Sequence, residues 1–478
     1  MRRGFVLLAL ALGMTILPVD VRLSGNRVVA IRDPHALAGA TANPPGTSLW
    51  TKRYNRPVNA TDVPRSLAIS PDGARVIVTG ESNNGLGTSF SIVAYDTSTG
   101  AKLWTSADLG GSFFDIAITP DGTKAIVTGV SGEDFLTVAY NTSTGATLWT
   151  SRYNSPVNGY DAPSGLAISR DGTKVVVTGV SSSTKSTFDA GFAFDYRTIA
   201  YNVSTGAMLW TSRYNGPWNN HDRASAVAIS PDGSKVIVTG DTAPDIEGPT
   251  DYATIAYSAS TGATLWTRLY NGPGNGWDSA RSLAISADGT KVIVTGESDG
   301  GLPSHEDYST IPYNTSTGVT LWAKRYHGGY GGDYPKHVAI SSDGTRVIVT
   351  GTSESASIRD FLTIAYNAST GATLWTKRHS GPGRGPDSPD ALAISQDGTR
   401  VIVAGDSDGG LTDYDYLTTA LNASTGELLW AKRYNGPVDR LDSVTDVAIR
   451  PDGLQVIVTG ASDGGVTRYD YLTIAYAM

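Results

Sequence analysis

Aspartates recur along the chain in two sets and are the most numerous side chains that could do chemistry. The first set precedes one short apolar segment: Asp62, Asp161, Asp222, Asp278, Asp333, Asp387 and Asp442. The second set precedes another apolar segment: Asp134, Asp195, Asp251, Asp307, Asp360, Asp415 and Asp470. Carboxylates gathered on one face would bind cations. A side chain that recurs in almost every copy of a repeat is explained more simply as a brace that accepts backbone N–H groups of a loop.

Aromatic residues and histidines that do not repeat are better candidates for a binding site, because a repeated residue must serve several equivalent positions. Trp218 and Trp277 are the only tryptophans outside a repeated Leu-Trp position. The ligand-binding candidates are Trp218, His221, Trp277, His305, His327, Tyr330 and Tyr334, beside an insertion with Phe188, Phe192 and Phe194. Exposed aromatic rings suit a carbohydrate or protein partner. The alternative is that they only cap longer loops.

Catalytic motifs are missing from the sequence. The chain contains no G-x-S-x-G elbow, no H-E-x-x-H pair and no glycine loop that cradles phosphate. Its six histidines do not follow the spacing of a local ligand motif, so we expect no metal site. The acidic stretch from Ser407 to Asp415 lacks the twelfth-position Glu of an EF-hand.

An internal repeat supplies the elements that position these candidates. Each copy contains an apolar segment such as LAIS, an Asp-Gly turn, a VIVTG segment, and a TIAY segment followed by a turn that ends in Leu-Trp. The Asp-Gly turns lie 49 to 61 residues apart and mark eight copies. They begin at Asp72, Asp121, Asp171, Asp232, Asp288, Asp343, Asp397 and Asp452. We expect four short antiparallel strands in each copy.

The VIVTG segments are apolar at successive positions, which indicates strands with both faces buried between neighbouring sheets. Four-stranded sheets with this period favour an all-β, eight-bladed propeller over an open solenoid. The last copy stops after Ala475-Tyr476, and its missing half, residues 46–50, begins the repeat region. We therefore expect a propeller over residues 46–478 whose N-terminal strand, residues 47–54, completes the last blade.

The stretch from Ala94 to Trp104 has the A-x-D-x-x-T-G-x-x-x-W spacing of the tryptophan-docking motif in eight-bladed quinoprotein alcohol dehydrogenases. The chain resembles the broader PQQ-like propeller repeat, and its RYNGP and VIVTG phrases are similar to bacterial SBBP-type repeats. The resemblance implies that one tryptophan per copy packs between blades: Trp50, Trp104, Trp149, Trp210, Trp266, Trp322, Trp375 and Trp430. Those enzymes hold their cofactor beneath two adjacent cysteines, and this chain has no cysteine. We expect no cofactor and no catalytic residue.

The N-terminal segment has the order of a secretory signal, with Met1-Arg2-Arg3 followed by an apolar run from Gly4 to Leu17. This run is shorter than the about 20 residues of a membrane span. We expect residues 1–40 to form a signal peptide and N-terminal segment cleaved near Ala38-Gly39-Ala40, an uncleaved anchor being the alternative. The net charge of −8 disfavours nucleic acid as a partner. The expected product is a secreted or cell-surface monomer.

These observations favour a secreted non-enzymatic propeller that binds a protein or carbohydrate partner through its longer loops, where function usually lies. One alternative is an enzyme, either a quinone-dependent oxidoreductase or a polysaccharide lyase or hydrolase. The other is a structural cell-surface scaffold. A calcium–quinone site, or an acid and a base that converge on the loop face, would favour the enzyme.

Overall fold

The computed structural model describes residues 21–24, 27–30, 43–56, 61–83, 88–106, 110–182, 193–243, 248–301, 306–329, 331–355, 358–383, 385–410, 413–465 and 468–478. The chain divides into two compact units, Met1–Pro44 and Pro45–Met478. In the first, β1 (Val21–Ser24) pairs with β2 (Arg27–Ala30) in antiparallel fashion. The apolar run and the cleavage site that we expect lie outside the described residues. Within those residues, no helix is long and apolar enough to cross a membrane.

The second unit consists of eight four-stranded antiparallel sheets, which we call blades 1 to 8. Blade 1 contains β4 (Asp62–Ile69), β5 (Arg75–Asn83), β6 (Thr88–Asp96) and β7 (Lys102–Thr105). Blade 2 contains β8 (Ser112–Ile118), β9 (Lys124–Ser131), β10 (Asp134–Asn141) and β11 (Thr147–Tyr153). Blade 3 contains β12 (Asp161–Ile168), β13 (Lys174–Ser182), β14 (Phe194–Asn202) and β15 (Met208–Tyr214). Blade 4 contains β16 (His221–Ile229), β17 (Lys235–Ala243), β18 (Asp251–Ser258) and β19 (Thr264–Tyr270).

The remaining blades follow the same plan. Blade 5 contains β20 (Asp278–Ile285), β21 (Lys291–Asp299), β22 (Glu306–Asn314) and β23 (Lys324–Tyr326). Blade 6 contains β24 (Asp333–Ile340), β25 (Arg346–Ser355), β26 (Ile358–Asn367) and β27 (Thr373–His379). Blade 7 contains β28 (Ser388–Ile394), β29 (Arg400–Asp408), β30 (Tyr414–Asn422) and β31 (Leu428–Tyr434). Blade 8 contains β32 (Asp442–Ile449), β33 (Gln455–Asp463), β34 (Tyr469–Ala477) and β3 (Ser48–Tyr54).

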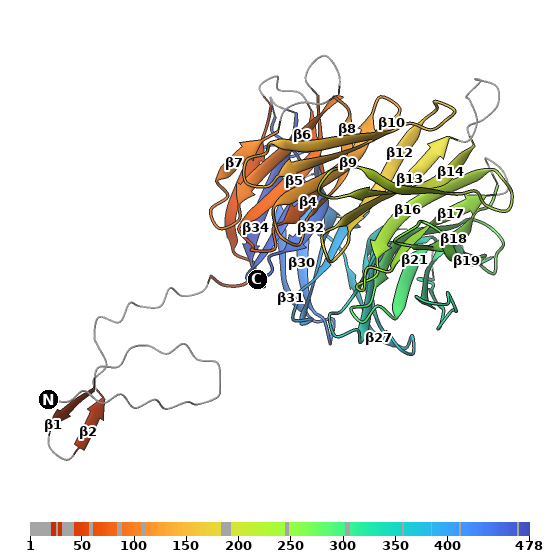
Figure 1. The fold of residues 1–478 in the computed structure, drawn as a ribbon. Helices are drawn as coiled ribbons and strands as arrows, with labels where there is room; N and C mark the ends of the chain where they lie inside the picture. The colour runs from red at the N-terminus through yellow and green to blue at the C-terminus, as the bar shows by residue number, and fades with distance from the viewer. Residues whose placement is uncertain are drawn as a thin grey trace. The chain divides into compact units, whose positions relative to one another are not determined.

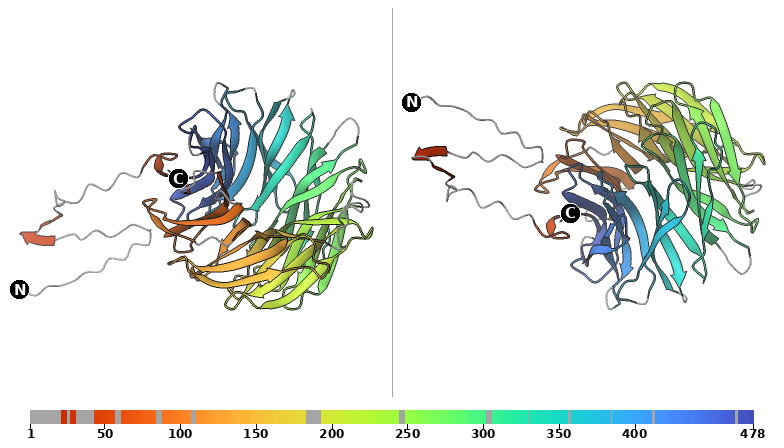
Figure 2. Two further views of the ribbon diagram at one scale, coloured as in Figure 1. Left: turned by 90° about the horizontal axis from the view of Figure 1, so that it is seen from above. Right: turned by 90° about the horizontal axis from the view of Figure 1, so that it is seen from below.

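The blades are arranged in a closed ring around a central axis. The first strand of each blade is its innermost strand and contacts the first strands of both neighbouring blades, and β32 of blade 8 contacts β4 of blade 1. Figures 1 and 2 show the blades in colour order, with the orange first blade beside the blue last blade. The fold is therefore the expected eight-bladed, all-β propeller.

The N-terminal strand closes this ring. Strand β3 pairs with β34 in antiparallel register, with Trp50 opposite Ala475 and Tyr54 opposite Tyr471. The carbonyl of Ala477 accepts the N–H of Gly46 at 2.8 Å, which continues the pairing beyond the strand. The prediction that the first strand completes the last blade is confirmed.

The second strand of each blade forms the core, because both of its faces lie against a neighbouring sheet. In β5 the side chains of Val76, Ile77 and Val78 are fully buried, and the equivalent residues of the other blades are buried as well. Apolar side chains at successive positions are therefore buried in two different inter-blade layers. This confirms the interpretation of the VIVTG segments.

The repeated tryptophans dock each blade onto the next one. The indole N–H of Trp50 donates to the carbonyl of Thr97 at 2.7 Å, and its ring lies against Gly100 of blade 1. Gly100 has a φ of 67°, a left-handed conformation that favours glycine. At the closing joint, Trp430 packs against Gly46 in the same way. The expected packing role of these tryptophans is confirmed.

Candidate binding site at the channel mouth

The first set of repeated aspartates braces the loops that lead into each inner strand. Asp222 accepts the backbone N–H of Gly216 at 2.7 Å, and Asp278 accepts that of Gly272 at 2.6 Å. All seven members of this set accept an N–H group from the loop before their own strand. The prediction of backbone braces is confirmed for this set.

The second set serves the blades in a different way, through ion pairs that the sequence analysis did not predict. Six of these aspartates pair with an arginine of the outer strand in the same blade. Blade 4 is the exception, because Leu269 occupies the position of the arginine opposite Ala253. Burial, together with the neighbouring Asp278, raises the pKa of Asp251 in this blade to about 6.

A β-bulge in every inner strand adds one residue that belongs to no repeated motif. The register of each inner strand shifts at this point. The added residues are Arg65, Phe114, Ser164, Ser225, Arg281, Lys336, Asp390 and Thr445. Four of them, from blades 1, 6, 7 and 8, line one cavity of about 440 Å³, which places them around the central channel. Bulges re-aim side chains and are frequent beside functional sites.

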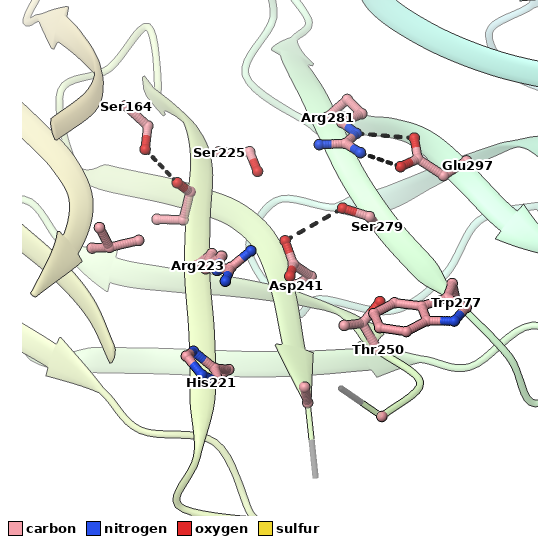
Figure 3. Close-up of a pocket in the computed structure, with 14 residues that line it drawn as sticks. Ser164, His221, Arg223, Ser225, Asp241, Thr250, Trp277, Ser279, Arg281 and Glu297 are labelled. Carbon is pink, nitrogen blue, oxygen red and sulfur yellow. Dashed lines mark hydrogen bonds and ion pairs between the residues drawn. The ribbon is translucent and has the colours of Figure 1, made fainter. Parts of the chain in front are cut away.

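We call the loop end of the ring, where the central channel opens, the channel mouth. There, blades 3 to 5 line a polar cavity of about 480 Å³ (Figure 3). Strand β16 contributes His221 and Arg223, and Trp277 lies just before β20. The charged groups that complete this lining are Asp241 of β17, Arg281 of β20 and Glu297 of β21. A volume of this size lies within the about 300–1,000 Å³ range of sites that bind small molecules or short segments. We call it the blade 4 cavity.

His221 lines the blade 4 cavity with two buried ring nitrogens that can form hydrogen bonds to a ligand. His221 is only 6% exposed, and neither ring nitrogen has a hydrogen-bond partner among the residues that the structure describes. Burial lowers the pKa of His221, and the charge of Arg223 lowers it further. The neutral imidazole therefore offers one donor and one acceptor. Because an unsatisfied buried polar group costs about 1–3 kcal/mol, a ligand or water that completes these bonds would be favoured.

Both signs of charge line the blade 4 cavity. The guanidinium of Arg281 donates two hydrogen bonds to the carboxylate of Glu297, one of them 2.9 Å long. The hydroxyl of Ser279 donates to Asp241 at 3.3 Å. Burial raises the pKa of Asp241 to about 6, although Arg223 and Arg281 act in the opposite direction. The cavity can therefore receive donors, acceptors and charged groups of either sign.

A second cavity of about 520 Å³ lies on the same face, lined by blades 6 and 7 and by Leu441 of the loop that leads into blade 8. Tyr334, Lys336 and Asp406 line it. The hydroxyl of Tyr334 donates to Glu306 at 3.3 Å, and the guanidinium of Arg359 lies 5.0 Å from the centre of the Tyr334 ring. Burial and the nearby Asp390 raise the pKa of Asp406 to about 7.

The structure brings some of the candidate residues together and separates others. His221 and Trp277 line one cavity, whereas Tyr334 lines the other. Trp218 is 42% exposed on the loop before β16, and it does not line the blade 4 cavity. His327 lies beside two aspartates at the boundary of blades 5 and 6. His305, Tyr330, Phe188 and Phe192 lie outside the described residues, while the Phe194 ring lies 5.5 Å from that of His221.

Sequence reasoning missed the charged residues of the blade 4 cavity because it looked for departures from the repeat only in loops. Arg223 and Arg281 lie in inner strands, and Asp241 and Glu297 directly follow the repeated Thr-Gly of the second strand. A signal was present. The residue after this Thr-Gly or Ala-Gly changes from copy to copy: Glu81, Val130, Val180, Asp241, Glu297, Thr352, Asp406 and Ala461.

The fold and the site define an eight-bladed propeller of the PQQ-like kind, with charged cavities at its channel mouth. The family model described as outer membrane protein assembly factor BamB matches residues 88–248, 138–324 and 309–473. The chain belongs to this family. No curated protein matches it.

Several solved propellers share the fold at low sequence identity. BamB from Moraxella catarrhalis has a TM-score of 0.52 at 16% identity, over 91% of this chain and 100% of that one. The Dos1 propeller has a TM-score of 0.58 at 13% identity, over 91% and 95% of the two chains. Sqt1 from Chaetomium thermophilum, bound to the N-terminus of the ribosomal protein L10, has a TM-score of 0.61 at 12% identity, over 91% and 100%.

Proposed function

We propose that this chain is an exported, non-enzymatic propeller that recognises a protein partner at its channel mouth. The observation that carries the proposal is His221, which lines the blade 4 cavity and whose two buried ring nitrogens have no hydrogen-bond partner within the described part of the chain. A peptide segment presents N–H and C=O groups at short intervals, so it supplies both an acceptor and a donor for a neutral imidazole.

The composition of the rim supports a protein partner. Tryptophan and arginine dominate the residues that carry binding energy in protein interfaces. Trp277 is 50% exposed at the cavity and Trp218 is 42% exposed on a loop of the same face. Arg223, which follows Trp218 and precedes Trp277 in the sequence, is exposed and also lines the cavity. These side chains offer exposed apolar area and positive charge to a partner.

Two comparisons support the same interpretation. The family is described as an outer membrane assembly factor, and the Sqt1 propeller was solved with the N-terminus of another protein bound. Export is supported by the charged and then apolar order of residues 1–17. An enzyme has less support, because Arg281 and Glu297 of the blade 4 cavity pair with each other and Asp241 accepts the hydroxyl of Ser279.

The test begins with residues 41–478 screened against a display library of peptides and, in parallel, against a glycan array. Affinity for a selected peptide is then measured for the wild type and for Trp218→Ala, Trp277→Ala and Arg223→Ala. A hot-spot side chain lost from the interface costs about 2 kcal/mol, which is about a thirtyfold loss of affinity. We expect that loss for Trp277→Ala and Arg223→Ala at an unchanged melting temperature.

Asp397→Ala provides the matched control, since Asp397 lies in a turn on the opposite face. It should bind like the wild type. If the screen selects glycans and no peptides, the proposed protein partner is wrong and the partner is a carbohydrate. Wild-type affinity in all loop-face variants would refute the site itself.

A further inference from the structure

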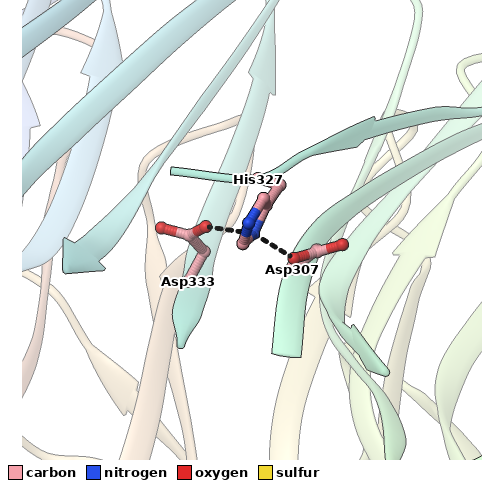
Figure 4. A group of neighbouring side chains, drawn as sticks. All are labelled: Asp307, His327 and Asp333. Atoms are coloured by element: carbon pink, nitrogen blue, oxygen red, sulfur yellow. Dashed lines mark hydrogen bonds and ion pairs between the residues drawn. The ribbon is translucent and has the colours of Figure 1, made fainter. Parts of the chain in front are cut away.

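Three side chains of ligand type converge where blade 5 meets blade 6 (Figure 4). The imidazole Nδ1 of His327 lies 3.1 Å from Oδ1 of Asp307 and 4.0 Å from Oδ2 of Asp333. All three atoms lie within 4.8 Å of one another. Asp307 comes from β22, Asp333 is the first residue of β24, and His327 lies in the loop between the two blades. This cluster is separate from the blade 4 cavity and does not depend on the proposed function.

His327 replaces an asparagine that most other blades carry at this position. The equivalent residues are Asn55, Asn154, Asn215, Asn271 and Asn435. Four of these asparagines donate their amide N–H to the residue four positions ahead, within their own loop. His327 does not continue this loop contact, because its imidazole points to the two carboxylates instead (Figure 4). The substitution therefore exchanges a loop brace for a metal-ligand type of side chain.

Negative charge exceeds positive charge at the cluster, which favours binding of a cation. Asp307 is 3% exposed and Asp333 is fully buried. One guanidinium, that of Arg325, pairs with Asp307 at 2.8 Å through the carboxylate oxygen that does not face His327. Among the described residues, Arg325 is the one lysine or arginine that forms an ion pair with these two buried carboxylates. The His327 side chain is 39% exposed, which gives solvent and ions access from the loop side.

We propose that Asp307, His327 and Asp333 bind a divalent transition-metal ion of the zinc type. An ion equidistant from the three donor atoms would lie roughly 2.0–2.4 Å from each of them, close to the about 2.0–2.2 Å of zinc–nitrogen and zinc–oxygen bonds. An imidazole beside carboxylates suits zinc, cobalt or nickel better than calcium, which prefers oxygen ligands alone. The exposed side of His327 leaves a further coordination position open to water or to a ligand.

The first test compares untagged wild-type protein with His327→Asn, which restores the residue that the other blades use and so preserves the fold. Zinc chloride is titrated by calorimetry, and cobalt chloride is titrated while the visible absorption of a low-coordinate cobalt site is recorded. We expect one ion per wild-type chain and at least a tenfold weaker affinity in the variant. Equal binding by both proteins, or no binding by the wild type at millimolar metal, would overturn the proposal.

A second variant asks whether the same geometry creates a site elsewhere. At the boundary of blades 7 and 8, Asn435, Asp415 and Asp442 occupy the repeat positions of His327, Asp307 and Asp333. Arg433 pairs with Asp415 at 2.8 Å, as Arg325 does with Asp307. Asn435→His should therefore raise the stoichiometry from one bound ion to two. A stoichiometry that stays at one in this variant, with the fold intact by circular dichroism, would show that two aspartates and a histidine in this arrangement do not suffice and would contradict the geometric argument.

Discussion

Aspartates lie at both ends of the blades, but the fold lowers the pKa of Asp288 in a turn and raises the pKa of Asp241 at the channel mouth. On the turn face, Asp288 accepts the hydroxyl of Ser286 and, at 3.0 Å, the N–H of Thr290, and these bonds lower its pKa to about 2. At the channel mouth, burial raises the pKa of Asp241 to about 6. The donors of the turn aspartate lie within two residues in sequence, whereas the surroundings of Asp241 come from different strands and blades.

This difference separates the frame from the site. An aspartate that recurs with its own local donors stabilises one turn per blade, and it does so in every copy. Among the described residues Asp241 has no such local donors, and its burial among charged residues that vary from copy to copy carries an electrostatic cost. Recurrence therefore identifies structural acids in this chain, and its absence identifies the acids worth testing for recognition.

The frame is tested most severely by removing β3. Deleting residues 1–55 should lower the melting temperature far more than deleting residues 1–40, because it exposes the edge of β34 and takes Trp50 out of its pocket. Loss of a buried tryptophan alone costs about 3–5 kcal/mol. Calorimetry of both truncations measures the difference.

The shorter truncation is the control, since it keeps all eight blades complete. Equal melting temperatures for the two proteins would contradict closure by β3. A loss of the same size from any variant of the channel mouth would also break the distinction between frame and site.

The pH dependence of stability sharpens the comparison. Folding raises the pKa of Asp115, Asp241 and Asp446 to about 6 and that of Asp406 to about 7. Their contribution is fully present below the unfolded pKa near 4 and is lost as the pH rises through about 6–7. The turn aspartates act in reverse, because their lowered pKa gives stability above pH 4 that is lost as the pH falls toward 2.

We therefore expect a higher midpoint of urea unfolding at pH 5 than at pH 8. Asp406→Asn should flatten this slope, whereas Asp288→Asn should leave it unchanged and lower the midpoint at both values. A midpoint of urea unfolding that rises from pH 5 to pH 8 would show that the buried aspartates with raised pKa do not govern stability in this range.

The smallest expected effect concerns the ion pair that blade 4 lacks. Leu269→Arg should supply Asp251 with the guanidinium that six other blades have, and so lower its raised pKa. Because the side chain at this position is 42% exposed, the gain should be at most about 1 kcal/mol. It should appear at pH 8 and shrink at pH 5, where Asp251 is largely protonated. Identical unfolding curves at pH 8 would contradict a missing pair.

The frame was predictable from sequence because its signals are local and repeated. The Asp-Gly turns, the strands buried on both faces and the docking tryptophans each follow from neighbours a few residues away. The split last copy, ending at Tyr476 and beginning again at Gly46, was sufficient to predict closure of the ring. The ion pairs of the second aspartate set were missed, since five of them join residues 18 positions apart on adjacent strands and the sixth joins Arg53 to Asp470.

The candidate site was predictable only in part. Trp277 stood out because it lies outside the repeated Leu-Trp position, and His221 because the chain has only six histidines. Arg223 and Arg281 did not stand out, because their orientation depends on bulges that shift the register of an inner strand. The approach of His327 to Asp307 and Asp333 also escaped prediction, since histidine spacing alone does not reveal which blades place carboxylates beside it.

The pairing of β3 with β34 also sets an order of folding. Arg53 of β3 donates to Asp470 at the other end of the chain, 417 positions away. The sheets of the first seven blades each pair strands that are consecutive in the chain, so each can form from contacts that are local in sequence. Strand β3 is synthesised before all of them, yet its partner is the last to appear. Strand β3 therefore completes its sheet last, although it is the first strand of the ring in the chain. Until it pairs, β34 has an unpaired edge that another chain could bind.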